Sequence, residues 1–244
     1  MNNSKKKCNY YVMILIINNS NRNLKIKNYV KTIQNKRLKR ETPPKKNGFF
    51  PMYVTDSILK KMKDHNIPFI NILCLEDLLE VIDKKIPVEG VIIGGSEIKL
   101  SLGKHPEDLL LPNILAIKHF KNKPIFGICF GFQIINVFFN GEISSLDNYI
   151  KDDKMVKLLE SDKQFKQSKS TIFKKQLSGK YRFLHGDYIS KLASSFIVRS
   201  VSADGVIQSI EHKTKPIFGT QFHPELSGER GEKLILNFLN ICGY

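Results

Sequence analysis

The chain has 244 residues, 41% of them hydrophobic, which is enough for one α/β domain with a full core. Its net charge of +16 would be typical of a nucleic-acid-binding protein. However, residues 1–65 hold 16 Lys or Arg against 3 Asp or Glu (+13), residues 151–180 hold 9 against 4 (+5), and all other residues sum to −2. The basic run at 36–40 has no interleaved aromatic residues. We therefore expect the basic segments to serve docking or solubility, and nucleic-acid binding stays an alternative.

Cysteine usage and hydropathy exclude several other classes of protein. The four cysteines, Cys8, Cys74, Cys129 and Cys242, show neither the paired spacing of a disulfide framework nor that of a zinc site. No apolar stretch is long enough to cross a bilayer. The apolar run Tyr10–Ile17 lacks the small-residue cleavage site of a signal peptide. We expect a cytoplasmic protein with no metal, no cofactor and no membrane association.

The predicted elements alternate between strand and helix along the first half of the chain, which indicates a parallel sheet. Strands are predicted at Tyr10–Ile17, Ile67–Leu73, Val88–Ile93 and Pro124–Ile128, with helices at Thr55–Asn66, Glu76–Lys84, Glu107–Lys121 and Gln133–Phe139. Short strands then follow at Lys180–Leu184, Phe196–Ser202, Val206–Glu211 and Pro216–Phe222, and a helix at Gly231–Ile241. Residues 1–244 are expected to form a single domain with basic insertions near 21–50 and 147–180, the second carrying some helix.

The segment Gly127-Ile128-Cys129-Phe130-Gly131 has the pattern of a nucleophile elbow. An apolar strand runs into a cysteine between two glycines and continues into a helical pattern. Glycines permit the sharp turn, and the positive end of the helix dipole favours a thiolate. The alternative is a buried core cysteine between a strand and a helix.

A second polar group ends the last predicted strand, in Gln221-Phe222-His223-Pro224-Glu225. In an extended segment, residues two apart project to the same face, so Glu225 can orient the ring of His223. A cysteine nucleophile needs such a base with an acceptor behind it. Alone the pair would be an ordinary surface His and Glu, but with the elbow it completes a triad.

These two motifs resemble the signature of the class I glutamine amidotransferases. Two further segments agree: Val91-Ile92-Ile93-Gly94-Gly95-Ser96, and Phe183-Leu184-His185-Gly186-Asp187, which is similar to the branch found in GMP synthetase. The resemblance covers roughly residues 66–244. It implies a flavodoxin-like three-layer α/β sandwich with a mostly parallel central sheet and an added antiparallel portion.

The resemblance also implies the chemistry. Cys129 would attack the side-chain amide of glutamine, His223 would carry protons, and Glu225 would orient His223. The backbone N–H groups of Gly95 and Phe130 would form the oxyanion hole. The expected substrate-binding residues are Gln133, His185, Gly186 and Asp187. For His185 a hydrogen-bonded turn histidine is an equally good interpretation.

Departures from the family pattern concern the oxyanion loop and the partner. Ser96 stands where the family usually has Pro, and the loop Asn18-Asn19-Ser20-Asn21 lacks the usual composition. Neither a Ser-Gly-Gly-x-Asp-Ser loop nor a Walker-type phosphate loop occurs in the sequence. We therefore expect ammonia to pass to a separate synthetase with an ATP-pyrophosphatase domain, GMP synthesis being the leading pathway. A stand-alone γ-glutamyl hydrolase and a non-catalytic, nucleic-acid-associated binding protein remain the alternatives.

Overall fold

The structure is a computed structural model, and it describes residues 12–19, 52–103, 105, 107–159 and 171–244. Seven strands form one sheet in the order β2-β1-β3-β4-β9-β8-β7. Their bounds are Met13–Ile17 (β1), Phe69–Ile72 (β2), Val88–Ile93 (β3), Ile125–Ile128 (β4), Phe196–Val201 (β7), Ile207–His212 (β8) and Ile217–Thr220 (β9). The pairs from β2 to β9 are parallel, whereas β8 and β7 are added antiparallel. The predicted sheet type is confirmed.

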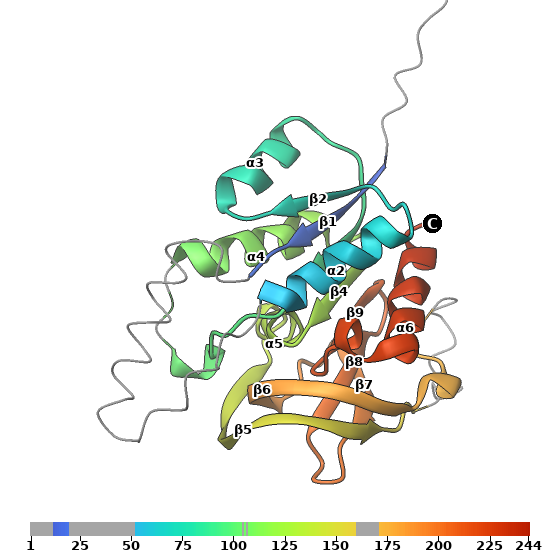
Figure 1. The fold of residues 1–244 in the computed structure, drawn as a ribbon. Coiled ribbons are helices and arrows are strands. Elements are labelled where there is room, and N and C mark those ends of the chain that lie inside the picture. Colours follow the sequence, from blue (N-terminus) through green and yellow to red (C-terminus); the bar gives the residue numbers. More distant parts are fainter. Residues whose placement is uncertain (1–11, 20–51, 104, 106, 160–170) are drawn as a thin grey trace, which may run out of the picture.

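Helices cover both faces of this sheet and complete the three layers (Figure 1). Helices α3 (Leu75–Asp83), α4 (Glu107–Phe120) and α5 (Phe130–Phe138) share one core cluster with the sheet, and α2 (Met52–Asp64) and α6 (Gly228–Ile241) share the other. Strand β1 shows why both faces are covered. Leu15 and Ile17 belong to the first cluster, while Ile14 and Ile16 belong to the second. Successive side chains of a strand point to opposite faces, so an unbroken apolar run needs a helix layer on each side.

Residues 142–156 and 179–191 include both ends of the predicted insertion at 147–180, and they are strands. They form two long antiparallel strands, β5 (Glu142–Val156) and β6 (Gly179–Lys191), in a separate two-stranded ribbon. In the described part of 147–180 the helical content is one short 3-10 turn, η3 (Lys175–Leu177). Strand β5 looks polar in sequence because most of its side chains are exposed or half-buried, whereas β6 is mostly buried. Pairing with β6 therefore determines the conformation of β5.

Oppositely charged side chains hold this ribbon in register. Asp153 is paired with Arg182 and forms an ion pair with it at 2.8 Å. Glu142 is paired with Lys191 at the other end, also with an ion pair, at 2.7 Å. Both pairs are at the surface, where solvent screens the attraction, so they favour one register more than they stabilise the ribbon. The charged residues of the predicted insertion thus include Asp153, which forms an ion pair between the two strands.

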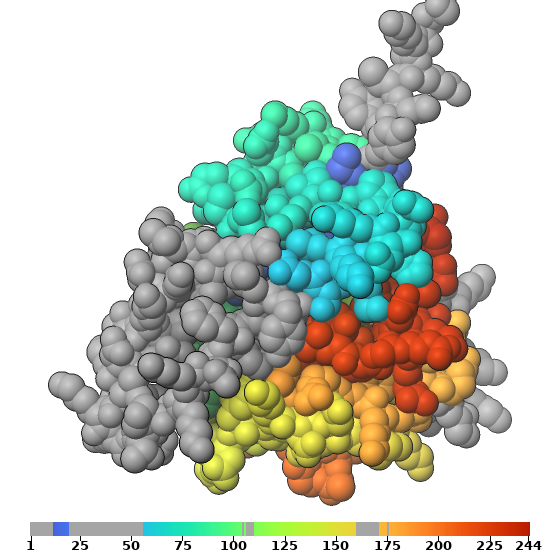
Figure 2. Space-filling view, viewed as in Figure 1, coloured from blue at the N-terminus to red at the C-terminus, as the bar shows by residue number. Residues whose placement is uncertain are grey.

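The C-terminal segment lies between the two halves of the molecule. In the space-filling view, α6 (red) separates α2 (cyan) from the β5–β6 ribbon (yellow and orange) (Figure 2). Within the described residues, no helix is both long and apolar enough to cross a membrane. The predicted insertion at 21–50 and the basic run at 36–40 lie outside the described residues.

The parallel strands place the predicted motifs together. Strands β1, β3, β4 and β9 run side by side in the same direction, so the segments that follow them emerge at one edge of the sheet. Those segments carry Asn19, Gly94 with Gly95, Cys129 and His223.

Candidate active site

Cys129 lies in the tight turn between β4 and α5. Its backbone has φ 54° and ψ −102°, a strained conformation for a residue with a Cβ. The N–H of Cys129 donates to the carbonyl of Thr220 at 2.7 Å, which fixes the turn against the end of β9. Helix α5 begins at Phe130, three residues earlier than predicted. The side chain therefore stands at the N-terminus of the helix, where the dipole favours an anion.

The two flanking glycines are required by close packing. A Cβ on Gly131 would lie 2.1 Å from the carbonyl oxygen of Ile93, and one on Gly127 would lie 2.5 Å from the backbone of Gly131. Any larger residue would push α5 away from β3 or β4. The Gly-x-Cys-x-Gly pattern is thus explained by helix-on-sheet contact as well as by the turn.

His223 and Glu225 form a buried pair. Nδ1 of His223 lies 2.8 Å from Oε1 of Glu225, and both side chains are at most 1% exposed. A carboxylate only accepts, so Nδ1 carries the proton and donates it to this bond. Nε2 is buried and has no hydrogen-bond partner among the described residues. The geometry leaves Nε2 as the nitrogen that is able to exchange a proton.

The electrostatics of His223 link it to Cys129. Burial alone lowers the pKa of His223, but its interactions with the carboxylate of Glu225 and with Cys129 outweigh burial and raise the pKa. The backbone is also fixed, because the N–H of His223 donates to the carbonyl of Arg182 at 2.8 Å. Cys129, His223 and Glu225 therefore form one interacting group, brought together from the ends of β4 and β9.

The sulfur of Cys129 has two further polar neighbours. Sγ lies 3.5 Å from the carbonyl oxygen of Leu184, to which the thiol donates. Nε2 of Gln221 lies 3.6 Å from Sγ and donates to it. The same amide is held from behind, since its Oε1 accepts from Nε2 of Gln133 at 3.0 Å. Gln133 is buried in this network and also donates to the carbonyl of Asp187 at 3.0 Å.

His185 lies within strand β6, so it is not a turn histidine. Nδ1 lies 2.9 Å from the carbonyl oxygen of Asp187 and must donate to it, which leaves Nε2 without a proton when the ring is neutral. Burial lowers the pKa of His185 to about 4, with a further contribution from nearby His223. The ring is therefore neutral at pH 7, and Nε2 is buried without a partner in the described part of the chain.

Asp187 and Gly186 contact the segment that follows β3. The carboxylate of Asp187 accepts from the backbone N–H of Ser101 at 2.9 Å and from its hydroxyl at 2.7 Å. Gly186 lies under the side chain of Lys99, because a Cβ there would be 2.5 Å from Cε of Lys99. Both residues thus hold Lys99 and Ser101 against β6.

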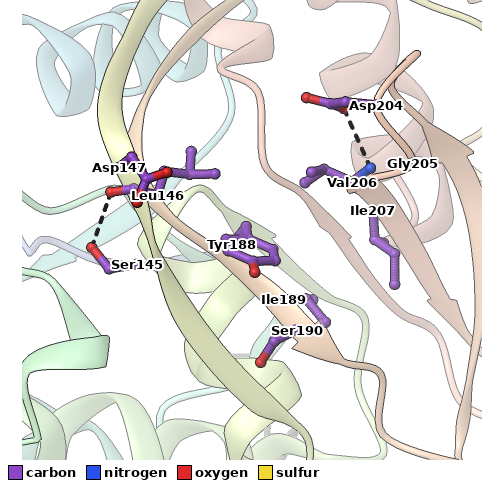
Figure 3. A pocket seen from close by; sticks show the side chains of 10 residues that line it. All are labelled: Ser145, Leu146, Asp147, Tyr188, Ile189, Ser190, Asp204, Gly205, Val206 and Ile207. Carbon is purple, nitrogen blue, oxygen red and sulfur yellow. Dashed lines mark hydrogen bonds between the residues drawn. The ribbon is translucent and has the colours of Figure 1, made fainter.

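A pocket of about 480 Å³ lies elsewhere, between the β5–β6 ribbon and the turn that joins β7 to β8 (Figure 3). Its lining includes Ser145, Asp147, Tyr188, Asp204 and Val206, and none of the predicted site residues. Tyr188 follows Asp187 in β6, so it points to the opposite face of the strand. This pocket is separate from the Cys129 group.

Sequence reasoning missed several residues of this site. Gln221 stands inside a motif that we singled out, but without an assigned role; its position two residues before His223 was the available signal. Asn19 donates to Gly94 in the segment after β3, and Asn113 pairs with Asn19. Ser101, inside that segment, donates to Asp187 on β6. Their sequence positions carry no signal for those contacts.

Comparison with known proteins identifies the family. The model of the family "Glutamine amidotransferase class-I" matches residues 52–241. The glutamine-hydrolyzing GMP synthase of Dictyostelium discoideum is 33% identical over 179 residues, which cover 68% of this chain and 23% of that protein. A protein of Methanocaldococcus jannaschii that is named as one subunit of a glutamine-hydrolyzing GMP synthase is 28% identical over 168 residues, which cover 68% of this chain and 80% of that protein. The chain thus spans under a quarter of the first relative and most of the second.

A solved structure has the same fold. The crystal structure of a protein from Thermoplasma acidophilum, described as a GMP synthase subunit, aligns with a TM-score of 0.66 at 20% identity, covering 96% of this chain and 94% of that one. The family model matches residues 52–241, which is more than half of the chain. The chain belongs to the class I glutamine amidotransferase family.

Proposed function

We propose that this chain hydrolyses the side-chain amide of glutamine through Cys129, His223 and Glu225 and supplies the ammonia to a separate synthetase subunit. The observation that carries the proposal is the Cys129 sulfur at a helix N-terminus, coupled to a buried His223–Glu225 pair. Homologues that are named as one separate subunit of GMP synthase support a separate partner. We propose GMP synthesis as the pathway and an ATP-pyrophosphatase domain in the partner.

In the first half-reaction, the Cys129 thiolate attacks the amide carbon of glutamine. The carbonyl oxygen becomes an oxyanion, which accepts from the N–H groups of Gly95 and Phe130. His223 gives its proton to the amide nitrogen, and the C–N bond breaks. Ammonia departs, and a γ-glutamyl thioester remains on Cys129. Glu225 keeps Nδ1 protonated, so that Nε2 is the atom that transfers the proton.

In the second half-reaction, water replaces ammonia. His223 takes a proton from water as the oxygen attacks the thioester carbon, the C–S bond breaks, and glutamate leaves while the thiolate is restored. We propose that Gln133, His185 and Gly186 line the glutamine pocket and that Asp187 acts through the segment that it fixes. A neutral His185 fits a pocket wall, because its one proton is held in the hydrogen bond from Nδ1 to the carbonyl of Asp187.

The test is ammonia release from glutamine by the wild-type chain and by Cys129→Ala, His223→Ala and Glu225→Gln. We expect no activity from Cys129→Ala, a loss of at least about 10³-fold for His223→Ala, and a smaller loss for Glu225→Gln. Ammonia release by Cys129→Ala would exclude the assigned nucleophile. Adding a purified ATP-pyrophosphatase partner separates the two enzymatic alternatives. If the chain supplies ammonia, glutamine should support product formation by the partner; a stand-alone γ-glutamyl hydrolase should release ammonia without supporting that reaction.

A further inference from the structure

Asn19, in the segment after β1, holds the peptide that precedes Gly95. Its Nδ2 donates to the carbonyl oxygen of Gly94 at 3.2 Å. Asn19 is 4% exposed, and Gly94 and Gly95 are buried as well. The other end of Gly94 is also fixed, because its N–H donates to the carbonyl of Ile17 at 3.1 Å. The backbone on both sides of Gly94 is thus tied to the end of β1.

Asn113, on helix α4, locks Asn19 in this orientation. Nδ2 of Asn19 donates to Oδ1 of Asn113 at 3.0 Å, and Nδ2 of Asn113 donates back to Oδ1 of Asn19 at 2.9 Å. Asn113 is completely buried. A flipped Asn19 amide would place an oxygen against the Gly94 oxygen and break the reciprocal pair. The amide therefore has one stable orientation, with its nitrogen toward Gly94.

Planarity of the peptide bond carries this constraint to Gly95. In a trans peptide the C=O and N–H bonds point in opposite directions, so fixing the Gly94 oxygen fixes the direction of the Gly95 N–H. The strand order β1-β3-β4 puts β1 on one side of Gly94 and the Cys129 turn on the other. The Gly94 oxygen faces Asn19 on the β1 side. The Gly95 N–H consequently faces the β4 side, where Cys129 lies.

We propose that Asn19, locked by Asn113, is a positioning residue that aims the Gly95 N–H at the oxyanion formed on Cys129. The inference rests on the proposed glutaminase function. Pre-aimed donors stabilise the charge that develops in the transition state, and they need no reorganisation at the moment of reaction. Glycine at 95 leaves the backbone free to rotate, so a contact outside the turn has to fix it. Asn19 provides that contact.

The test compares Asn19→Ala and Asn113→Ala with Asn136→Ala. Asn136 is a matched control because it is equally buried and bonds the carbonyls of Glu142 and Lys191 at 3.3 and 3.0 Å, away from Gly95. We expect Asn19→Ala to lower kcat by about 10- to 100-fold at nearly unchanged KM, since a transition-state contact is weakened. Asn136→Ala should lower the melting temperature but leave the kcat of the folded enzyme unchanged.

Two probes of Cys129, an aldehyde and an alkylating agent, distinguish a misoriented oxyanion donor from a general disruption of the active site. Glutamate γ-semialdehyde adds to the thiol as a thiohemiacetal, so its affinity should fall in parallel with kcat in Asn19→Ala. Alkylation of Cys129 by iodoacetamide needs the thiolate only, and its rate should not change. Asn113→Ala should cause a smaller loss than Asn19→Ala and add little to it in the double variant, because Asn113 acts through Asn19.

Unchanged kcat in a folded Asn19→Ala protein would overturn the proposal, and so would a rise in KM alone or an equal loss in Asn136→Ala. If Asn19→Ala does not fold, the kcat of Asn113→Ala tests the proposal instead. This variant keeps the Asn19 donor to Gly94 but loses the Asn113 side chain that orients it. Failure of the glutaminase assignment looks different: the wild-type chain would then neither release ammonia from glutamine nor bind the semialdehyde at Cys129.

Discussion

Nε2 of Gln221 lies 3.6 Å from Sγ of Cys129, although 92 residues separate them in the sequence. An amide N–H stabilises a thiolate more than a thiol, because a hydrogen bond to a charged acceptor is the stronger one. Oε1 of Gln221 is held by Gln133, which is itself anchored to β6. The donor is therefore fixed in place before the thiolate forms.

We predict that Gln221→Glu slows the alkylation of Cys129 by iodoacetamide at pH 7 by at least about 10-fold, because the variant loses the hydrogen bond to sulfur and, when ionised, places a like charge beside the thiolate. Glu has the shape of Gln and still accepts from Gln133, but when ionised it cannot donate to sulfur. The matched control is Gln208→Glu, a buried glutamine that donates to Ser202 at 2.9 Å. Equal alkylation rates in the wild-type and Gln221→Glu proteins would contradict a role for Gln221 at the sulfur.

Cysteine labelling should be selective. Burial raises the pKa of Cys242 to about 12, so its thiol stays protonated at neutral pH. We predict that a short iodoacetamide pulse at pH 7.5 labels Cys129 and leaves Cys242 unlabelled until the protein is unfolded. Peptide mass spectrometry measures both sites, and excess glutamine should protect Cys129. Rapid native labelling of Cys242 would show that the C-terminus of α6 opens.

The features that the sequence predicted well depend on residues that are close together in the chain. The elbow at Cys129 and the His223–Glu225 pair are encoded by residues at most a few positions apart, where glycine spacing and strand periodicity have direct physical meaning. The parallel sheet was likewise readable from apolar runs such as Val88–Ile93. These features need no knowledge of distant segments.

What the sequence could not provide depends on long-range pairing. Strand β5 is polar and exposed, so its conformation comes from β6 and not from its own periodicity. The contacts of Asn19 with Asn113 and of Ser101 with Asp187 join residues 94 and 86 positions apart. The helix was predicted to begin at Gln133 but begins at Phe130, and Gly131 in its first turn permits contact with Ile93, a contact that the local sequence does not reveal.

Gly131 gives a sharp test of that contact. Alanine is the better helix former by about 1 kcal/mol, so helix propensity alone predicts that Gly131→Ala stabilises the protein. Its Cβ would, however, lie 2.1 Å from the carbonyl oxygen of Ile93, a backbone atom that cannot rotate away. We predict a loss of more than about 2 kcal/mol in the free energy of unfolding, measured by urea denaturation. In the control Gly205→Ala, the added Cβ meets open space but φ is +81°, so the cost should be about 1 kcal/mol. A milder effect at Gly131 than at Gly205 would mean that α5 shifts easily.

The neutral state of His185 should make the protein acid-sensitive. In the folded protein the pKa of His185 is lowered to about 4, chiefly by burial, whereas the unfolded chain has a value near 6.5. Between these values the unfolded state binds more protons than the folded state, so stability falls as the pH drops through this window. From pH 7 to pH 5 this one group should remove about 2 kcal/mol from the free energy of unfolding.

The variant His185→Asn isolates this contribution, because its amide is able to donate to the carbonyl of Asp187 as Nδ1 does but cannot titrate. We predict that the difference in unfolding free energy between pH 7 and pH 5 shrinks by about 2 kcal/mol in this variant, measured by urea denaturation at both pH values. His119→Asn, at an exposed position on α4, serves as the control and should keep the wild-type difference. If His185→Asn kept the full acid loss, His185 would have to be protonated at pH 5 in the folded protein, and its place as a neutral wall beside His223 would be wrong.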